Sequence, residues 1–467
     1  MSFTSVIFIT VFLPVFLICY FAVPAKKIRV RNMVLFLFSL VFYAWGGVRY
    51  LALLLASVLL NYLGGLLVHC CDGSVRRRRA ALALIVTGNV LLLGVFKYAN
   101  FVTGTLASAG LPVAVTAISL PIGISFYTFQ GMSYVFDVYR GRAALAKSPL
   151  TVALYISLFP QLVAGPIVRY TTVERELTDR RTTVPEFAAG AVRFMLGFGK
   201  KVILANAMGE IADQVFSRSG TALLTTPLAW LGAAAFTLQI YFDFSGYSDM
   251  AIGLGRMLGF HFNENFSYPY IADSITDFWR RWHISLSSWF RDYIYIPLGG
   301  NRRGVPRQIL NLLVVWSLTG LWHGANWTFI LWGLYYGLLL ILEKFLIGDR
   351  LRRIPGVFRH ILTLLLVMIG WVLFRSATIT DAADYLAVMF GAGGSAPAET
   401  VYLLREYAVA LVLSLVAILP VRDRLLSRLG NGTAVQLGTA VFAMAVFFLS
   451  YMRLVSGSFM PFIYFQF

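Results

Sequence analysis

The chain has 467 residues, of which 59% are hydrophobic and only 13% are charged, and its mean hydropathy is +0.75. A soluble domain is about one quarter charged, so this composition excludes a soluble globular protein and indicates a polytopic membrane protein. Lysine and arginine exceed the acidic residues by 39 − 21 = 18, which raises nucleic-acid binding as a second explanation.

The distribution of the basic residues favours membrane topology over nucleic-acid binding. They fall in short clusters between apolar runs, namely KKIRVR (26–31), RRRR (76–79), NRRGVPR (301–307), RLRR (350–353) and RDRLLSR (422–428). Short loops rich in Lys and Arg stay on the cytoplasmic side of a membrane. We therefore expect these clusters inside the cell, the lipid bilayer as a partner, and no nucleic acid.

The first apolar run, residues 3–23, is predicted to remain as a span with the N-terminus outside. No basic residue precedes it, and Lys26 and Lys27 follow it, which is the wrong polarity for a cleaved signal peptide. Further spans are predicted at 33–44 and 50–68 (a hairpin around 45–49), then 80–96, 119–138, 230–254, 309–342 with an interruption, 361–375, 401–420 and 436–455. We expect an all-α fold with about eleven full spans in a single domain over residues 1–467.

Two segments depart from this pattern of clean spans. The run 154–170 contains Pro160 and Pro166, which break helices, so it forms either a cavity wall or a simple kinked helix. The polar stretch 171–187 is expected in water. The segment 188–215 carries charged residues, Lys200 and Lys201 among them, and is predicted to lie along the membrane interface.

The span at 230–254 contains two acids, Asp243 and Asp249. Six residues turn a helix by about 600°, so the two carboxylates point to different faces and a shared metal site is not predicted. Two interpretations stay open: the acids brace neighbouring polar groups, or Asp243 has a direct role in a channel.

The stretch 277–326 is the strongest functional candidate, because it contains two of the five histidines beside apolar sequence: DFWRRWHISLSSWFRDYIYIPLGGNRRG and, further on, SLTGLWHGAN. An ionisable group at membrane depth is a functional hypothesis by default, and histidine moves protons near pH 7. His283 is either an ordinary interfacial residue on an amphipathic helix or a group at the mouth of a cavity. His323 would lie about 24 Å from Arg307 along a continuous helix, or shallower if the helix unwinds at Gly320 and Gly324.

A positioned histidine can remove the proton of a hydroxyl as that hydroxyl attacks an acyl carbonyl. Candidate oxyanion donors or channel-lining residues are Asn326, Trp322 and Trp282, with Asp243 as a further channel candidate. The sequence has no Gly-x-Ser-x-Gly elbow and no His-Glu-x-x-His zinc motif, so neither a serine nucleophile nor a metal is predicted.

The two histidine motifs, WRRWHISLSSWFRDYIYIPLGGNR (279–302) and LWHGANWTFILWG (321–333), resemble those of the membrane-bound O-acyltransferase family, in particular its bacterial alginate O-acetyltransferase branch. The segments 120–141, 158–169, 241–255 and the terminal FIYFQF resemble that branch too. The resemblance implies a ring of spans, with re-entrant and interfacial helices, around a central funnel or tunnel. It implies that His323 matches the family's catalytic histidine and that His283 matches a second histidine near the channel.

The resemblance further implies a bacterial inner-membrane enzyme that passes an acyl group, most simply acetyl, from a cytoplasmic donor to an extracytoplasmic polysaccharide. Transfer would be direct or through a partner, an extracytoplasmic acetyltransferase or polysaccharide-modifying protein. The expected donor is acetyl-CoA or an acyl carrier, with no tightly bound cofactor; a D-alanyl group for teichoic acid is the alternative. Two other classes stay open: a transporter with a histidine proton relay, and an inert scaffold subunit. The sequence lacks the two similar halves usual in transporters.

Overall fold

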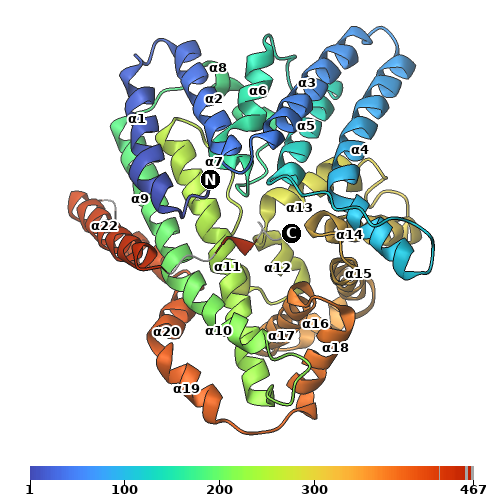
Figure 1. Ribbon diagram of the computed structural model, residues 1–467, viewed down its shortest axis with the longest axis vertical. Helices are drawn as coiled ribbons and strands as arrows, with labels where there is room; N and C mark the ends of the chain where they lie inside the picture. Colours follow the sequence, from blue (N-terminus) through green and yellow to red (C-terminus); the bar gives the residue numbers. More distant parts are fainter. Residues whose placement is uncertain (431, 458–460, 464–467) are drawn as a thin grey trace. The chain divides into compact units, whose positions relative to one another are not determined.

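The structure is a computed structural model of the chain that describes residues 1–430, 432–457 and 461–463. The described residues contain helices and no β-strand, which confirms the all-α class (Figure 1). By its internal contacts the chain divides into two compact units, Met1–Phe194 with Ser248–Asn263, and Met195–Tyr247 with Glu264–Phe467. The expected single domain over residues 1–467 stays a prediction.

The first unit is built from the N-terminal helices. These are η1 (Phe8–Phe12), α1 (Leu13–Ala22), α2 (Ile28–Ala44), α3 (Arg49–Cys70), α4 (Val75–Ser108), α5 (Ile124–Tyr139), α6 (Pro149–Ser157), α7 (Phe159–Leu162), α8 (Tyr170–Thr178) and most of α9 (Val184–Gly199). The predicted hairpin of 33–44 and 50–68 is confirmed as α2 and α3. The segment predicted at 119–138 begins five residues later, at Ile124, because Gly123 adopts a left-handed conformation that starts α5.

The short helix α7 supplies the centre of an aromatic core in this unit. The ring of Phe159 is 5.1 Å from Phe16, 5.5 Å from Phe12 and 5.5 Å from Phe42. All four side chains are buried. The predicted break in the run 154–170 is confirmed at Leu158, between α6 and α7. Because the broken segment is buried in protein, its irregular backbone needs no contact with lipid.

Helices α3 and α4 are joined by a pair of amides. Asn61 and Asn89 each donate from Nδ2 to the other's Oδ1 at 3.0 Å, and both residues are fully buried. Inside a membrane such a bond holds two helices together because no water competes for the polar groups.

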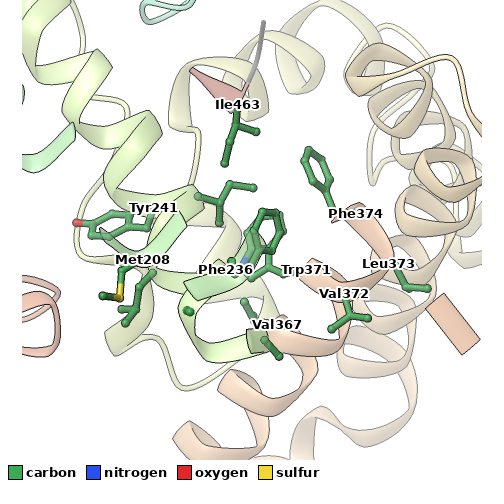
Figure 2. Close-up of a cluster of buried hydrophobic side chains, with 14 of the residues drawn as sticks. Met208, Phe236, Tyr241, Val367, Trp371, Val372, Leu373, Phe374 and Ile463 are labelled. Atoms are coloured by element: carbon green, nitrogen blue, oxygen red, sulfur yellow. The ribbon is translucent and has the colours of Figure 1, made fainter. Parts of the chain in front are cut away.

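The second unit contains the later helices. These are η2 (Lys200–Ala205), α10 (Asn206–Phe216), α11 (Thr226–Met257, as far as Tyr247), η3 (Pro269–Ile271), α12 (Ile275–Arg281), α13 (Ile284–Phe290), η4 (Arg291–Tyr295), α14 (Val305–His323), α15 (Trp327–Leu342), η5 (Glu343–Ile347), α16 (Gly348–Arg353), α17 (Gly356–Arg375), α18 (Ile379–Ala387), η6 (Val388–Ala392), α19 (Ala398–Glu406), α20 (Ala408–Ala417), α21 (Val421–Leu429) and α22 (Thr433–Val455). Its core is aromatic; Figure 2 shows Phe236, Trp371 and Phe374 within it.

Five helices in the described residues are long and apolar enough to cross a membrane, or six if a bent pair is counted as one span. They are Arg49–Cys70, Val75–Ser108, Trp327–Arg353, Gly356–Arg375 and Thr433–Val455. Only 11% of the most apolar stretch of the last of these is buried in protein, as expected for a helix that faces lipid. The chain is a multi-pass membrane protein. The expected count of about eleven spans is not confirmed.

Two predicted segments differ from the structure. The span expected at 401–420 is two short helices, α19 and α20, bent by 70° at Tyr407. The segment 188–215 is a continuous run of α9, η2 and α10, and Lys201 in its π-helical turn is only 3% exposed. Lys201 is buried against Asp243 and is not one of the residues that give this segment a polar face. The interfacial position expected for residues 188–215 stays a prediction.

Candidate active site

Helix α14 carries His323 at its last position and forms a close hairpin with α15. At Gly320 an added Cβ would collide with the backbone oxygen of Phe329, and at Gly333 with that of Trp316. Neither position accepts a larger residue without moving one helix away from the other. Of the two alternatives that the sequence left open, the helix is continuous through Gly320 as far as His323, and it unwinds only at Gly324, which is extended.

The imidazole of His323 is surrounded by aromatic rings. Its centroid is 4.9 Å from Trp332, 5.0 Å from Trp322 and 5.3 Å from Phe374, all edge to face. The residue is 4% exposed. The ring is thus enclosed by protein and packed on aromatic side chains.

His283 lies at a break in the chain and not within one amphipathic helix as the sequence suggests. It separates α12 from α13 and has φ 45° and ψ 52°. A left-handed conformation costs a residue with a side chain about 1–2 kcal/mol. Two backbone bonds hold the turn, from Ile284 N to Asn265 O at 3.0 Å and from Ser267 N to Arg281 O at 3.0 Å.

Asn265 fixes the tautomer of His283. The Oδ1 atom of Asn265 accepts from the backbone N–H of Ser285 at 3.3 Å and from the Ser285 hydroxyl at 2.8 Å. A backbone N–H can only donate, so the atom facing His283 is an acceptor. His283 Nδ1, 3.1 Å away, therefore carries the proton and donates it to Asn265, and Nε2 carries the lone pair.

Replacing Asn265 with alanine removes the acceptor that orients the His283 ring. If His283 acts in transfer, we expect Asn265→Ala to lower the transfer rate by about 10- to 100-fold, as loss of a group that orients a reactive histidine does elsewhere. Ser285→Ala is the matched control, because it removes only one donor to the same Asn265 oxygen. Initial rates of acyl transfer by the purified variants measure both; equal rates for the two variants would argue against the tautomer role.

The structure brings the two sequence-predicted histidines together. Their ring centroids are 6.4 Å apart, and His283 is 1% exposed. Trp322 lies against both, 5.9 Å from His283 and 5.0 Å from His323. Phe244 of α11 covers His283 edge to face at 4.6 Å. Both imidazoles therefore lie in one aromatic enclosure.

The other candidates have different surroundings. Asn326 begins α15: its Oδ1 accepts from Thr328 N at 3.2 Å, and its Nδ2 donates to Ala377 O at 2.9 Å. Trp282 packs in the aromatic core, 4.8 Å from Trp371. An oxyanion role for Asn326, Trp322 or Trp282 stays a prediction.

Asp243 braces its neighbours, as one of the two interpretations of the sequence has it. Its Oδ1 forms an ion pair with Lys201 Nζ at 2.5 Å, and its Oδ2 accepts from the backbone N–H of Ile463 at 2.7 Å. Asp243 is 1% exposed. The preceding residue, Phe462, lies 6.0 Å from Phe244, the ring that covers His283. Of the terminal motif FIYFQF, residues 464–467 lie outside the described part of the chain.

Sequence reasoning missed Asn265 and the burial of Lys201. Asn265 stands in the irregular stretch 261–268, where no periodicity points to a role. For Lys201 a signal existed: a lysine among apolar residues and an aspartate in a nearby span are opposite charges that burial requires to pair.

The chain has membrane-length helices and a buried pair of histidines. These two features place it in the class of polytopic membrane proteins with a histidine centre. The model of the membrane-bound O-acyltransferase family, MBOAT, matches residues 82–378, which include both histidines. The chain belongs to this family and is an O-acyltransferase. This result excludes the transporter and inert-scaffold alternatives as its main activity.

The chain is similar to curated proteins over most of its length. It is 46% identical to a probable alginate O-acetylase of Azotobacter vinelandii over 84% of this chain and 79% of that one. It is 41% identical to a probable alginate O-acetylase of Pseudomonas putida over 100% of both. It is 35% identical to a peptidoglycan O-acetyltransferase of Helicobacter pylori over 84% of this chain and 80% of that one.

Proposed function

We propose that this protein moves an acetyl group from a cytoplasmic donor, acetyl-CoA or an acyl carrier, across the bacterial inner membrane. The group then O-acetylates an extracytoplasmic polysaccharide, directly or through an extracytoplasmic partner protein. The observation that carries the proposal is the enclosed pair of imidazoles at 6.4 Å. The names of the relatives, which act on alginate and peptidoglycan, support a polysaccharide acceptor.

The direction of transfer rests on the basic clusters. Helix α14 begins within NRRGVPR (301–307), and α17 begins just after RLRR (350–353). If both clusters stay in the cytoplasm, as the orientation rule requires, both helices run outward. His323 and Arg375, their last residues, would then lie toward the far side of the membrane. The same rule applied to 26–31 and 76–79 supports an N-terminus outside the cell.

The proposed chemistry uses His323 as a general base. The imidazole takes the proton from the acceptor hydroxyl as the hydroxyl oxygen forms a bond to the acyl carbonyl carbon. The bond from that carbon to the donor sulfur breaks, and the thiolate leaves with the proton that His323 releases. A general base of this kind contributes about 10²–10⁴ to the rate. His283, with its lone pair on Nε2, is proposed to accept or return a proton on the donor side.

The test is a deletion strain compared with the same strain carrying the wild-type gene. We expect mass spectrometry of the isolated surface polysaccharide to show O-acetyl groups lost in the deletion strain and restored by the gene. Unchanged acetylation would contradict the proposal. Loss of D-alanyl groups instead of acetyl groups would replace it by the D-alanyl alternative, because the two modifications differ in mass.

A further inference from the structure

A pocket of about 520 Å³ lies within the second unit, as bounded by the residues that the structure describes. Its walls include Asp213 and Phe216 of α10, Phe236 and Gln239 of α11, Arg375 at the end of α17, and Ile463. This volume falls in the range of small-molecule sites, roughly 300–1,000 Å³.

Two of the stretches that form the pocket also reach the histidine rings. Arg375 lines the pocket, and the residue before it, Phe374, lies 5.3 Å from the His323 ring. Ile463 lines the pocket, and the residue before it, Phe462, packs on Phe244, which covers His283. Figure 2 shows Phe374 and Ile463 together with Phe236. The pocket and the histidine enclosure therefore share two short stretches of chain, Phe374–Arg375 and Phe462–Ile463.

Gln239 gives the pocket an unused polar group. The residue is 7% exposed, and its Oε1 has no hydrogen-bond partner among the residues that the structure describes. A buried polar atom without a partner destabilises a protein. Because Gln239 lines the pocket, a ligand there can supply the missing donor.

The charged and aromatic groups of the pocket are held in fixed positions. Arg375 forms an ion pair with Asp213, and its guanidinium lies 4.8 Å from the Phe216 ring and 4.9 Å from the Phe236 ring. The arginine charge is thus balanced within the pocket wall. The wall offers N–H donors, carboxylate and amide acceptors, and apolar ring edges, without one dominant charge.

We propose that this pocket binds a short carbohydrate segment of the acyl acceptor and so holds one of its hydroxyls next to His323. Sugar hydroxyls both donate and accept hydrogen bonds, which matches a wall that contains both kinds of group. Gln239 Oε1 accepts from one hydroxyl, and the Arg375–Asp213 pair bonds to others. A pocket of this volume suits a compact ring better than an extended peptide, whose backbone groups need a groove or a strand edge. This inference rests on the proposed function and names its acceptor class.

The test measures oligosaccharide binding to the full-length protein in nanodiscs, separately from catalysis. The probes are a mannuronate tetrasaccharide and a neutral N-acetylglucosamine tetrasaccharide, followed by saturation-transfer NMR and calorimetry. We expect one of them to bind, and Gln239→Leu to weaken that binding about tenfold, as loss of one hydrogen bond does. Gln214→Leu is the matched control: Gln214 is exposed on the same α10 as Asp213 and does not line the pocket.

Failure of this inference is distinguishable from failure of the proposed function. Binding is also measured for His323→Ala, which we expect to bind the oligosaccharide while transferring no acetyl group. Absence of binding for both probes, or equal binding by Gln239→Leu and wild type, overturns the carbohydrate site. Protection of the pocket by an extracytoplasmic polypeptide instead of a sugar, seen by hydrogen exchange of α10 and residues 374–377, overturns it as well.

Discussion

Replacing His323 with alanine is expected to abolish acetylation of the surface polysaccharide while the protein still inserts and accumulates. The ring is 4% exposed, at the end of α14, and its neighbours are aromatic carbons. The expected loss is about 10²–10⁴ in rate, the usual contribution of a positioned base. Acetyl content of the polymer and the membrane content of the variant are the two measurements.

The control for this variant is His69→Ala, a change of the same size on an exposed part of α3. The His69 side chain is 58% exposed and lies 3.3 Å from Asp72, so its loss removes a histidine without touching the aromatic enclosure. We expect wild-type acetylation from it. Full acetylation by His323→Ala at normal protein levels would show that this imidazole is not the base and would remove the main support for the mechanism.

The histidine pair could be predicted from the sequence because its signal is local. A histidine inside apolar sequence is costly wherever the chain folds, so His283 and His323 stand out without any knowledge of the fold. Their mutual distance could not be predicted, because it depends on how α13, α14 and α17 pack. The tautomer of His283 depends on Asn265, which lies 18 positions earlier in the sequence, on the other side of α12. Hydropathy carries no information about such a contact.

The helix ends were less predictable than the helices themselves. Apolar runs locate a helix, but they do not show where a buried chain turns inside protein. The turn at His283 is held by backbone bonds that involve residues 265 and 267. At Tyr407 the helix α19, which carries charged residues at both ends, meets the apolar helix α20 at a bend of 70°. At Gly320 the sequence left both a continuous and an unwound helix open. Its sequence context suggested flexibility, whereas its role is to let α14 and α15 approach each other closely.

Breaking the Lys201–Asp243 ion pair is expected to have the second large effect. Both side chains are buried, at 3% and 1% exposure, and the pair joins η2 to α11. Asp243→Ala leaves a buried ammonium group without its carboxylate and the Ile463 N–H without its acceptor. Removing one partner of a buried pair costs about 3–5 kcal/mol. We expect a lower unfolding temperature in detergent and faster hydrogen exchange of the Ile463 amide.

A set of variants separates the charge from the hydrogen bond. Asp243→Asn keeps an oxygen for the Ile463 N–H and removes the charge, whereas Lys201→Met leaves the carboxylate buried alone. The double variant has no buried charge, and we expect it to be more stable than the sum of the two single effects predicts, because the pair is coupled. Since Phe462 reaches His283 through Phe244, activity is expected to follow exchange at Ile463 rather than the unfolding temperature. Unaltered exchange and a loss below about 1 kcal/mol in Asp243→Ala would mean that the pair does not anchor residues 461–463, and that the wall beside His283 is held by its aromatic contacts alone.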